Sequence, residues 1–381
     1  MNFDFTEDHL MIQQSAREFA QEAIAPSAVE RDINAEFPVG IVKQLGELGF
    51  MGMMVSPDYG GSGLDMISYV LAMIEISKVD ASVGVIMSVN NSLVCYGLEK
   101  YGTDYIKQNY LVPLAKGEKL GAFCLSEPEA GSDATNQRTT ADKKDNHFLL
   151  NGMKNWVTNG KNADYYLVMA TTDKEKGHKG ISTLLVEKDF EGFGQGKKED
   201  KLGIRSSDTC SLTFENCKIP VENLVWDEGK GFNFAMNTLN GGRIGIAAQA
   251  IGIAEASFEA SVKYSKERKA FGSPIANLQA IQFKLSDMAI KVDCAKMLTF
   301  KAAALKDAGK SYYREAAMAK LYSSKVAVEN ALDAIQVHGG YGYVREYLVE
   351  RYLRDAKITE IYEGTSEIQK VVIARSLFDE K

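Results

Sequence analysis

The chain has 381 residues, of which 45% are hydrophobic and 25% charged. This composition excludes a disordered chain, a collagen-like repeat and a small disulfide scaffold. The length is too great for one ordinary core and predicts about two or three domains. With 44 Lys and Arg against 51 Asp and Glu, the net charge is −7, so electrostatics give no reason to expect nucleic acid or an anionic membrane as a partner.

The sequence predicts neither a membrane span nor a secretory signal. Its longest apolar run, residues 67–74, is far shorter than the roughly 18 residues that a span needs, and the N-terminus is acidic. The five cysteines are odd in number and none forms Cys-x-x-Cys, so we expect reduced thiols in the core. The start at Met1 without a transit peptide favours a cytoplasmic bacterial protein, or a mitochondrial matrix protein if the chain is a processed one.

The first third of the chain is predicted to be helical, because only seven prolines occur in the whole sequence. Apolar residues recur at helical spacing over residues 5–24, ending before Pro26, and again over residues 39–48 and 66–76. Residues 57–63 form a loop by composition.

The pattern changes near residue 121 to short strands separated by turns. Residues 165–172 and 181–186 are apolar runs, and residues 210–215 alternate as in a half-buried antiparallel strand. The Asn-Gly pairs at residues 151–152 and 159–160 predict turns. Helical periodicity returns over residues 244–258 and 281–292.

We therefore predict an α+β multidomain fold. It has an N-terminal helical domain (residues 1–120), a middle antiparallel β domain (121–228) and a C-terminal helical bundle (229–381). Common catalytic motifs are missing: there is no Gly-x-Gly-x-x-Gly opening a helix, no P-loop, no nucleophile elbow and no metal-ligand spacing among the four histidines. We assign no metal site.

Residues 123–133 form the first unusual segment, a strand that runs into a loop rich in hydroxyl groups. Gly131 permits close approach of the backbone to a ligand. Free backbone N–H groups and the hydroxyls of Ser126 and Ser132 are suited to cradle a flavin or a phosphate. An ordinary strand-to-loop turn is the alternative interpretation.

The second segment, Asn240-Gly241-Gly242-Arg243, is predicted to begin a long helix with an apolar face. An arginine in the first turn opposes the helix dipole. We therefore interpret Arg243 as facing a carboxylate or a bound ligand. The alternative is a surface arginine beside a flexible glycine pair.

The third segment contains Tyr362-Glu363-Gly364 just before the last helix. Ser366 and Gln369 have the spacing of a capping box, which predicts that this helix begins at Ser366. A carboxylate in an apolar pocket acquires a raised pKa and can act as a general base. The alternative is a solvated glutamate that precedes a helix.

Together these segments resemble the acyl-CoA dehydrogenase family, and the likeness runs from the N-terminal helices to the last helix. One signature is Ser126-Glu127-Pro128-x-Ala130-Gly131-Ser132-Asp133. The other is Gln336-x-x-Gly339-Gly340-x-Gly342, followed by Arg354-Asp355-Ala356-x-Ile358-x-x-Ile361-Tyr362-Glu363-Gly364-Thr365. Between them, in the family's order, lie Trp156-x-Thr158-Asn159-Gly160 and Arg268-x-x-Phe271-Gly272.

The resemblance implies FAD as cofactor, bound between the β domain and the C-terminal bundle. By similarity, the flavin ring and ribityl chain lie against Phe123, Leu125, Ser126, Ser132, Trp156 and Thr158. The pyrophosphate and adenosine of a neighbouring subunit's flavin are reached by Arg268, Phe271, Gln279, Gln336, Gly339 and Gly340. Thr365 and Glu367 complete the cofactor contacts. A site shared in this way implies at least a dimer, and the family is typically a homotetramer made of two dimers.

The resemblance also implies the reaction, α,β-dehydrogenation of an acyl-CoA thioester. Glu363 matches the family's base and would take the α-proton while flavin N5 takes the β-hydride. The Glu363 N–H and a ribityl hydroxyl would bind the thioester oxygen as an oxyanion hole does. Substrate contacts are assigned by similarity to Ser132, Asn240, Arg243, Tyr362 and Gly364. Some relatives carry the base near residue 242, where this chain has no carboxylate.

The acyl chain length and the electron acceptor are less directly implied. The Gly241-Gly242 pair and residues 359–363 look most like butyryl-CoA-type, short-chain members, and the usual electron acceptor is an electron-transferring flavoprotein. His338 stands where many relatives carry an apolar residue. An acyl-CoA oxidase or enoyl-CoA reductase on the same fold remains an alternative, as does a helical scaffold that has lost catalysis.

Overall fold

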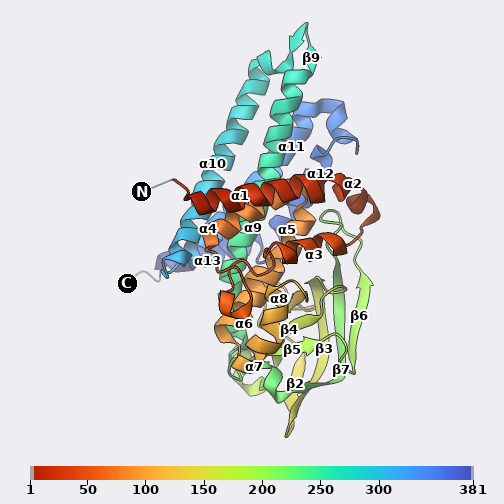
Figure 1. Cartoon of the computed structure of the whole chain (residues 1–381), viewed down its shortest axis with the longest axis vertical. Coiled ribbons are helices and arrows are strands. Elements are labelled where there is room, and N and C mark those ends of the chain that lie inside the picture. The colour runs from red at the N-terminus through yellow and green to blue at the C-terminus, as the bar shows by residue number, and fades with distance from the viewer. Residues whose placement is uncertain (1–3, 379–381) are drawn as a thin grey trace.

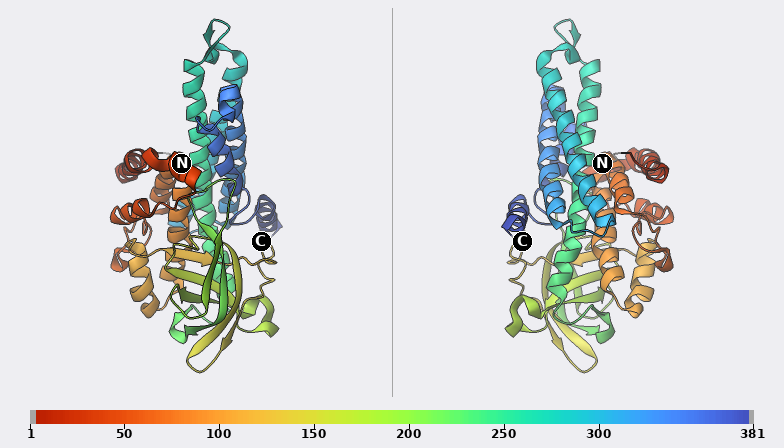
Figure 2. Two further views of the ribbon diagram at one scale, coloured as in Figure 1. Left: turned by 90° about the vertical axis from the view of Figure 1, so that its right-hand side faces the viewer. Right: turned by 90° about the vertical axis from the view of Figure 1, so that its left-hand side faces the viewer.

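The computed structural model describes residues 4–378, and in chain order these form a helical part, a sheet and a second helical part (Figure 1). The N-terminal helices and the sheet both pack along the long helix α9 (Gly231–Glu267), while the far ends of α9, α10 and α11 extend beyond them (Figure 2). The expected succession of helical, β and helical regions is therefore confirmed.

The N-terminal part is almost wholly helical. Its longer elements are α1 (Glu7–Phe19), η1 (Ala20–Ile24), α2 (Ala25–Asn34), α3 (Val39–Glu47), α4 (Met66–Val79), α5 (Ala81–Ser88), η3 (Val89–Cys95) and α6 (Tyr96–Tyr101). Shorter helices follow as α7 (Asp104–Ile106), η4 (Lys107–Leu111) and α8 (Val112–Ala115). The helical structure predicted up to Pro26 is present, but it continues past the proline to Asn34. A π-helical segment precedes the proline, which then sits in the first turn of α2, where its missing N–H is tolerated.

The middle part is an eight-stranded sheet with the order β6-β7-β3-β2-β4-β5-β8, and with β1 beside β4. The strands are β1 (Gly121–Cys124), β2 (Thr140–Lys143), β3 (His147–Thr158), β4 (Tyr165–Thr171), β5 (Ile181–Glu187), β6 (Phe193–Lys198), β7 (Thr209–Pro220) and β8 (Leu224–Val225). The expectation of a purely antiparallel sheet needs correction, because β1 and β2 both pair with β4 in parallel.

Of the two Asn-Gly dipeptides predicted to form turns, only one does so. Asn159 has a positive φ of 65° and begins a turn after β3, as predicted. The turn predicted at Asn151-Gly152 is absent, because both residues lie inside β3 at a shift in the register with β7. Residues on both sides of Asn151-Gly152 remain paired with β7, so β3 continues through this point. The dipeptide therefore lies at a β-bulge and not in a hairpin turn.

The C-terminal part is a helical bundle built on α9. The other elements are β9 (Lys269–Ala270), β10 (Ser273–Pro274), α10 (Gln279–Asp307), α11 (Tyr313–His338), η8 (Gly339–Tyr343), α12 (Val349–Thr359) and α13 (Ser366–Phe378). The face of α9 that carries Ile244, Ala248 and Ile251 is fully buried, as its periodicity predicts.

The structure also modifies the expectations that all five cysteines are buried and that no segment is long and apolar enough to span a membrane. Cys294 is exposed, whereas the other four cysteines are buried as expected. Within residues 4–378, one helical stretch, Ala81–Tyr101, is long and apolar enough to cross a membrane by length and composition, with a mean hydropathy of 1.3. Of its most apolar window, 94% is buried inside the protein, which is the pattern of a core helix.

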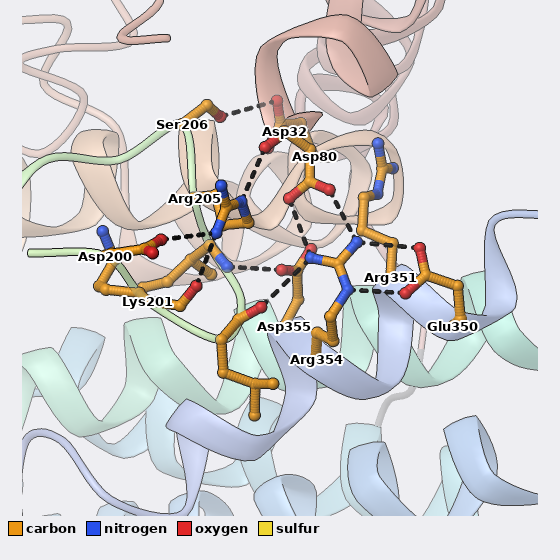
Figure 3. Close-up of polar contacts among 12 residues, drawn as sticks. Asp32, Asp80, Asp200, Lys201, Arg205, Ser206, Glu350, Arg351, Arg354 and Asp355 are labelled. Atoms are coloured by element: carbon orange, nitrogen blue, oxygen red, sulfur yellow. Dashed lines mark hydrogen bonds and ion pairs between the residues drawn. The ribbon is translucent and has the colours of Figure 1, made fainter. Parts of the chain in front are cut away.

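A buried ionic cluster joins the three parts of the chain (Figure 3). On α12, Arg354 forms two hydrogen bonds with the Asp32 carboxylate of α2, at 2.7 and 3.1 Å, and also binds Glu350 at 2.6 Å. Asp355, the next residue, accepts a hydrogen bond from the Ile204 N–H in the loop before β7, at 2.5 Å. Burial raises the pKa of Asp355 to about 7, against the opposing charge of Arg351.

This cluster fixes α12 against both neighbours. Arg351 donates to the Val79 carbonyl at 2.7 Å, and Arg205, from the sheet region, donates to the Asp32 carbonyl at 2.9 Å. Since α12 ends at Thr359, four residues before Glu363, the cluster determines where the following turn begins.

Candidate active site

The turn that follows α12 carries Glu363 in an unusual backbone conformation. Glu363 has a φ of 51° and Gly364 a φ of 93°, both in the left-handed region. A non-glycine residue in this region is strained and persists only where its surroundings hold it. The Gln369 amide does so by donating to the carbonyls of Glu363 and Gly364, at 3.1 and 2.9 Å. Lys320 Nζ also donates to the Gly364 carbonyl, at 2.7 Å.

The last helix begins at Ser366 as predicted, but the capping box does not form. Thr365, one residue earlier, accepts a hydrogen bond from the Ile368 N–H at 3.3 Å and acts as the cap. The Gln369 side chain donates instead to the Glu363 and Gly364 carbonyls in the preceding turn. The side chain that the local pattern assigned to the helix cap is therefore used in a tertiary contact, where it holds two carbonyl groups of a strained turn.

The Glu363 carboxyl group is buried without a hydrogen-bond partner for Oε2 among the described residues. Burial raises the pKa of Glu363 to about 7, and the positive charges of Lys320 and Arg243 oppose this rise. The Glu363 N–H likewise donates to no acceptor within residues 4–378. The residue therefore presents an unused basic oxygen and an unused N–H donor.

Gly242 of α9 lies directly against this carboxyl group. A Cβ placed on Gly242 would be 2.1 Å from Glu363 Oε2 and 2.8 Å from Leu93 Cδ2, so no other residue fits without displacement. At the adjacent Gly241, a Cβ would meet Lys306 Nζ at 3.4 Å, an ordinary contact. The absence of a carboxylate at residue 242, seen in the sequence, thus has a steric reason.

Arg243 does not lie in the first turn of its helix, where it was predicted, but it does face a carboxylate, that of Glu363, as inferred. It lies well inside α9, which begins at Gly231, so the helix dipole is not involved. Arg243 is buried, its Nη1 donates to Asn240 Oδ1 at 2.7 Å, and its Nε has no partner among the described residues. Burial lowers the pKa of Arg243, and the charge of Glu363 opposes this. Beside them, the Tyr362 hydroxyl donates to Gln249.

A buried ion pair organises the loop after β1. Lys154 Nζ lies 2.6 Å from Glu127 Oε1 and also donates to the Leu125 carbonyl at 3.1 Å. The other oxygen of Glu127 accepts the Arg138 N–H at 2.6 Å. This arrangement ties the loop to β3.

The residues predicted to face a flavin ring lie on β1, on the loop after it and on β3. The Asn155 N–H donates to the Ser126 carbonyl at 2.9 Å, which brings the β1 loop beside β3. Trp156, at a second register shift in β3, has a positive φ of 59° and a side chain that is 65% exposed. Thr158 ends the strand, and Phe123 packs on Phe234 of α9. Ser132 is exposed in the same loop.

The residues predicted to reach a neighbouring flavin lie at the opposite end of α9. Arg268 follows this helix, Phe271 is 94% exposed at the tip of the β9-β10 hairpin, and Gln279 and Gln336 are exposed nearby. A surface cavity of ≈ 470 Å³ is lined there by Tyr264, Arg268, Ile275, Val337, His338, Gly339, Gly340, Tyr341, Val344 and Glu346.

That cavity is chemically suited to a phosphate group. The Arg268 guanidinium lies 5.5 Å from the Tyr341 ring centroid and has no carboxylate partner within residues 4–378. Gly339 and Gly340 have nothing within 4 Å of a Cβ, so a ligand can approach their backbone. His338 is buried and stacked on Tyr264 at 4.1 Å, with Nδ1–H donating to the Ala334 carbonyl at 2.8 Å. It therefore forms the wall of the cavity.

Thr365 and Glu367 lie apart from both of these groups of predicted cofactor contacts. They border a surface cavity of ≈ 810 Å³ between α10, α11 and α13, together with Lys325, Lys357 and Lys370. From Gly242 to Arg268, α9 rises about 39 Å, at roughly 1.5 Å per residue. The two predicted halves of the cofactor site are therefore far apart within one chain (Figure 1).

Sequence reasoning missed four residues that build this site: Lys154, Gly242 as a contact of Glu363, Lys320 and Gln369. Lys154 and Lys320 belong to no motif with a recognisable local role, while the sequence pattern places Gln369 in a capping box and Gly242 in a flexible glycine pair. The one available signal was a charged residue in an apolar helical stretch, as at Lys320 in Ala316-Ala317-Met318-Ala319-Lys320-Leu321.

We predict opposite effects of alanine at the two adjacent glycines of α9. Gly241→Ala should be neutral or stabilise the protein by up to about 1 kcal/mol, because alanine is the better helix former. Gly242→Ala should destabilise it by about 1–3 kcal/mol, because its Cβ overlaps the Glu363 carboxyl group. Chemical denaturation measures both, and a crystal structure of Gly242→Ala should show Glu363 displaced. Equal stabilities of the two variants would contradict this packing.

Comparison with known proteins gives the same family for every part of the chain. Family models match residues 6–118 (acyl-CoA dehydrogenase, N-terminal domain), 122–217 (middle domain) and 229–378 (C-terminal domain). The chain is 50% identical over 374 residues to the mitochondrial short-chain specific acyl-CoA dehydrogenase of Mus musculus, covering 98% of this chain and 91% of that protein.

Solved structures agree. Butyryl-CoA dehydrogenase from Megasphaera elsdenii has a TM-score of 0.98 and 46% identity, covering 99% of this chain and 100% of that one. A chain solved in work on the electron transferring flavoprotein of Acidaminococcus fermentans and flavin-based electron bifurcation has a TM-score of 0.99 and 49% identity, with 100% of both chains covered. With its whole length matched and its fold reproduced, this chain belongs to the acyl-CoA dehydrogenase family.

Proposed function

We propose that this protein is an FAD-dependent dehydrogenase of short-chain acyl-CoA thioesters, of the butyryl-CoA to crotonyl-CoA type, with Glu363 as its base. The observation that carries the proposal is the buried Glu363 carboxyl group, which has an unpartnered oxygen and a pKa raised to about 7 by burial. Such a group is suited to accept a proton near neutral pH. The names of the short-chain and butyryl-CoA relatives support the substrate class.

The chain's residues fit FAD. Trp156 offers an exposed aromatic face beside the loop that carries Leu125 and Ser126, with Phe123, Ser132 and Thr158 close to it in the sequence or sheet. Arg268, without a carboxylate partner, and the open backbone at Gly339 and Gly340 suit a pyrophosphate. Phe271, Gln279, Gln336, Thr365 and Glu367 would complete the contacts. When bound, FAD supplies the acceptor for the hydride from the β-carbon.

In the proposed reaction, Glu363 Oε2 would remove the α-proton of the thioester, and bound FAD would supply the two-electron acceptor for the β-hydride, so that a C=C bond forms and charge and electrons balance. The Glu363 N–H is free to donate to the thioester oxygen, on which negative charge develops. Asn240, Arg243, Tyr362, Gly364 and Ser132 would position the substrate. Burial of the site excludes water that would otherwise solvate the carboxylate.

The wider organisation follows from the same proposal. We infer three working domains, residues 1–120, 121–228 and 229–381, and a homotetramer made of two dimers. An electron-transferring flavoprotein would receive the electrons, as the related structure from Acidaminococcus fermentans suggests. The cytoplasm would be the site of action in a bacterium, and the mitochondrial matrix if the chain is a processed eukaryotic one.

Glu363→Gln tests the base directly. Glutamine keeps the size and the N–H of the residue but cannot accept a proton, so FAD and acyl-CoA binding should survive. Flavin reduction by butyryl-CoA, followed by stopped-flow absorbance, should fall by about 10²–10⁴-fold or more. Glu47→Gln, which removes an exposed carboxylate, should retain the parent rate. A Glu363→Gln rate within tenfold of the parent would assign the base elsewhere.

Chain length tests the substrate class. We expect butyryl-CoA to reduce the flavin faster than octanoyl-CoA does, because the segments around Gly241 and Thr359 look like those of short-chain members and the relatives named above are short-chain and butyryl-CoA enzymes. A series of acyl-CoAs from four to sixteen carbons, measured in the same way, gives the optimum. An optimum at eight or more carbons would overturn the short-chain assignment.

Subunit complementation tests the shared cofactor site. Arg268→Met and Glu363→Gln should each be inactive at limiting FAD. If each site takes Glu363 from one subunit and Arg268 from its partner, hybrid dimers contain one intact site. Co-expression of the two variants should then restore about a quarter of the parent activity by random pairing. No recovery in verified hybrid dimers would show that each subunit holds its own complete site.

A further inference from the structure

Lys320 is a fully buried cation whose role neither the sequence signatures nor the proposed chemistry explains. It lies in the middle of α11, and its side chain is entirely removed from solvent. Within residues 4–378 it forms no ion pair, and its one hydrogen bond goes to the Gly364 carbonyl at 2.7 Å. Because an isolated buried ammonium group is strongly disfavoured, something in the folded protein must offset its burial.

The groups that face Lys320 and Glu363 identify what offsets it. The charge that acts most strongly on Lys320 is that of Glu363, followed by Arg243 of α9 and then Glu360 and Glu367. Glu363 is in turn faced by Lys320 and Arg243. Two neutral phenols complete its surroundings, Tyr69 of α4 and the adjacent Tyr362, and burial raises the pKa of both.

Resting on the proposed function of Glu363, we propose that Lys320 is a positioning residue for the catalytic base. Its hydrogen bond to the Gly364 carbonyl fixes the strained turn, and its positive charge favours the carboxylate form of Glu363. Gln369 shares the first task, because it binds the same carbonyl, but as a neutral amide it cannot perform the second. Substituting each residue in turn therefore distinguishes the effect of the hydrogen bond to the turn from the effect of the positive charge.

The two titrations fit this arrangement. Burial lowers the pKa of Lys320 to about 8, with Glu363 opposing the fall, and burial raises that of Glu363 to about 7. Since Glu363 works as a base only when ionised, activity should rise with pH as its carboxyl loses the proton. Removing the positive charge of Lys320 disfavours the carboxylate, so this rise should move to higher pH.

The test compares Lys320→Met with Gln369→Leu in the FAD-loaded protein. Lys320→Met removes the charge and the hydrogen bond, and we expect the acid limb of the rate of flavin reduction to move up by about one pH unit or more. Gln369→Leu removes only neutral hydrogen bonds and should lower the rate at all pH values without moving the limb. Lys320→Gln, which keeps a donor but no charge, should shift the limb as Lys320→Met does and should remain folded if methionine is not tolerated.

A second measurement does not depend on turnover. Difference infrared spectroscopy of the carboxylic acid C=O band, assigned by its loss in Glu363→Gln, reports protonation of Glu363 directly. Its titration should move up in both Lys320 variants and stay in place in Gln369→Leu. An unmoved titration in folded Lys320→Gln would overturn the proposal, while Glu363 would remain the base if Glu363→Gln is still inactive. A fully active Glu363→Gln would instead reject the proposed function.

Discussion

The buried contact between Arg354 and Asp32 is the constraint on which the rest of the arrangement depends. Two hydrogen bonds join α12 to α2, and the neighbouring Asp355 joins the same helix to the loop before β7. Both side chains keep only a small exposure, so removing one partner would leave the other charge poorly solvated between the three parts of the chain. All three parts of the chain therefore meet at one helix, and the turn that carries Glu363 is the next structure after it.

Two kinds of force then act on Glu363. Packing holds its carboxyl group against Gly242 and away from water, which favours the protonated form and a raised pKa. The buried charges of Lys320 and Arg243 favour the carboxylate and limit that rise. The balance of these two effects is a carboxyl group with a pKa near 7, as the proposed base requires. The strained backbone of Glu363 contributes to this arrangement, because both the carboxyl Oε2 and the N–H of this residue lack a protein partner within residues 4–378.

The length of α9 gives a physical reason for a shared cofactor site. One end of this helix lies by the sheet and Glu363, and the other carries Arg268 and the cavity lined by Gly339 and Gly340. Both ends have features of a flavin site, an exposed aromatic face at one and a cation without a carboxylate partner at the other. One chain holds these two ends far apart, so the proposed cofactor site would need a second copy to complete it.

The sequence by itself determined the succession of helical, β and helical regions, the buried face of α9 and the family, because periodicity and turn chemistry are local and the signatures are contiguous. It also singled out Glu363 as a candidate base and Arg243 as an arginine that faces a carboxylate or a ligand. Only the tertiary structure decided that Arg243 lies inside its helix, that Gln369 leaves the predicted cap for the turn, and that Asn151-Gly152 is a bulge. Lys320, Gly242 and the ionic cluster on α12 also came from the structure alone. Their roles arise from contacts between segments far apart in the chain, and no local pattern encodes a contact of that kind.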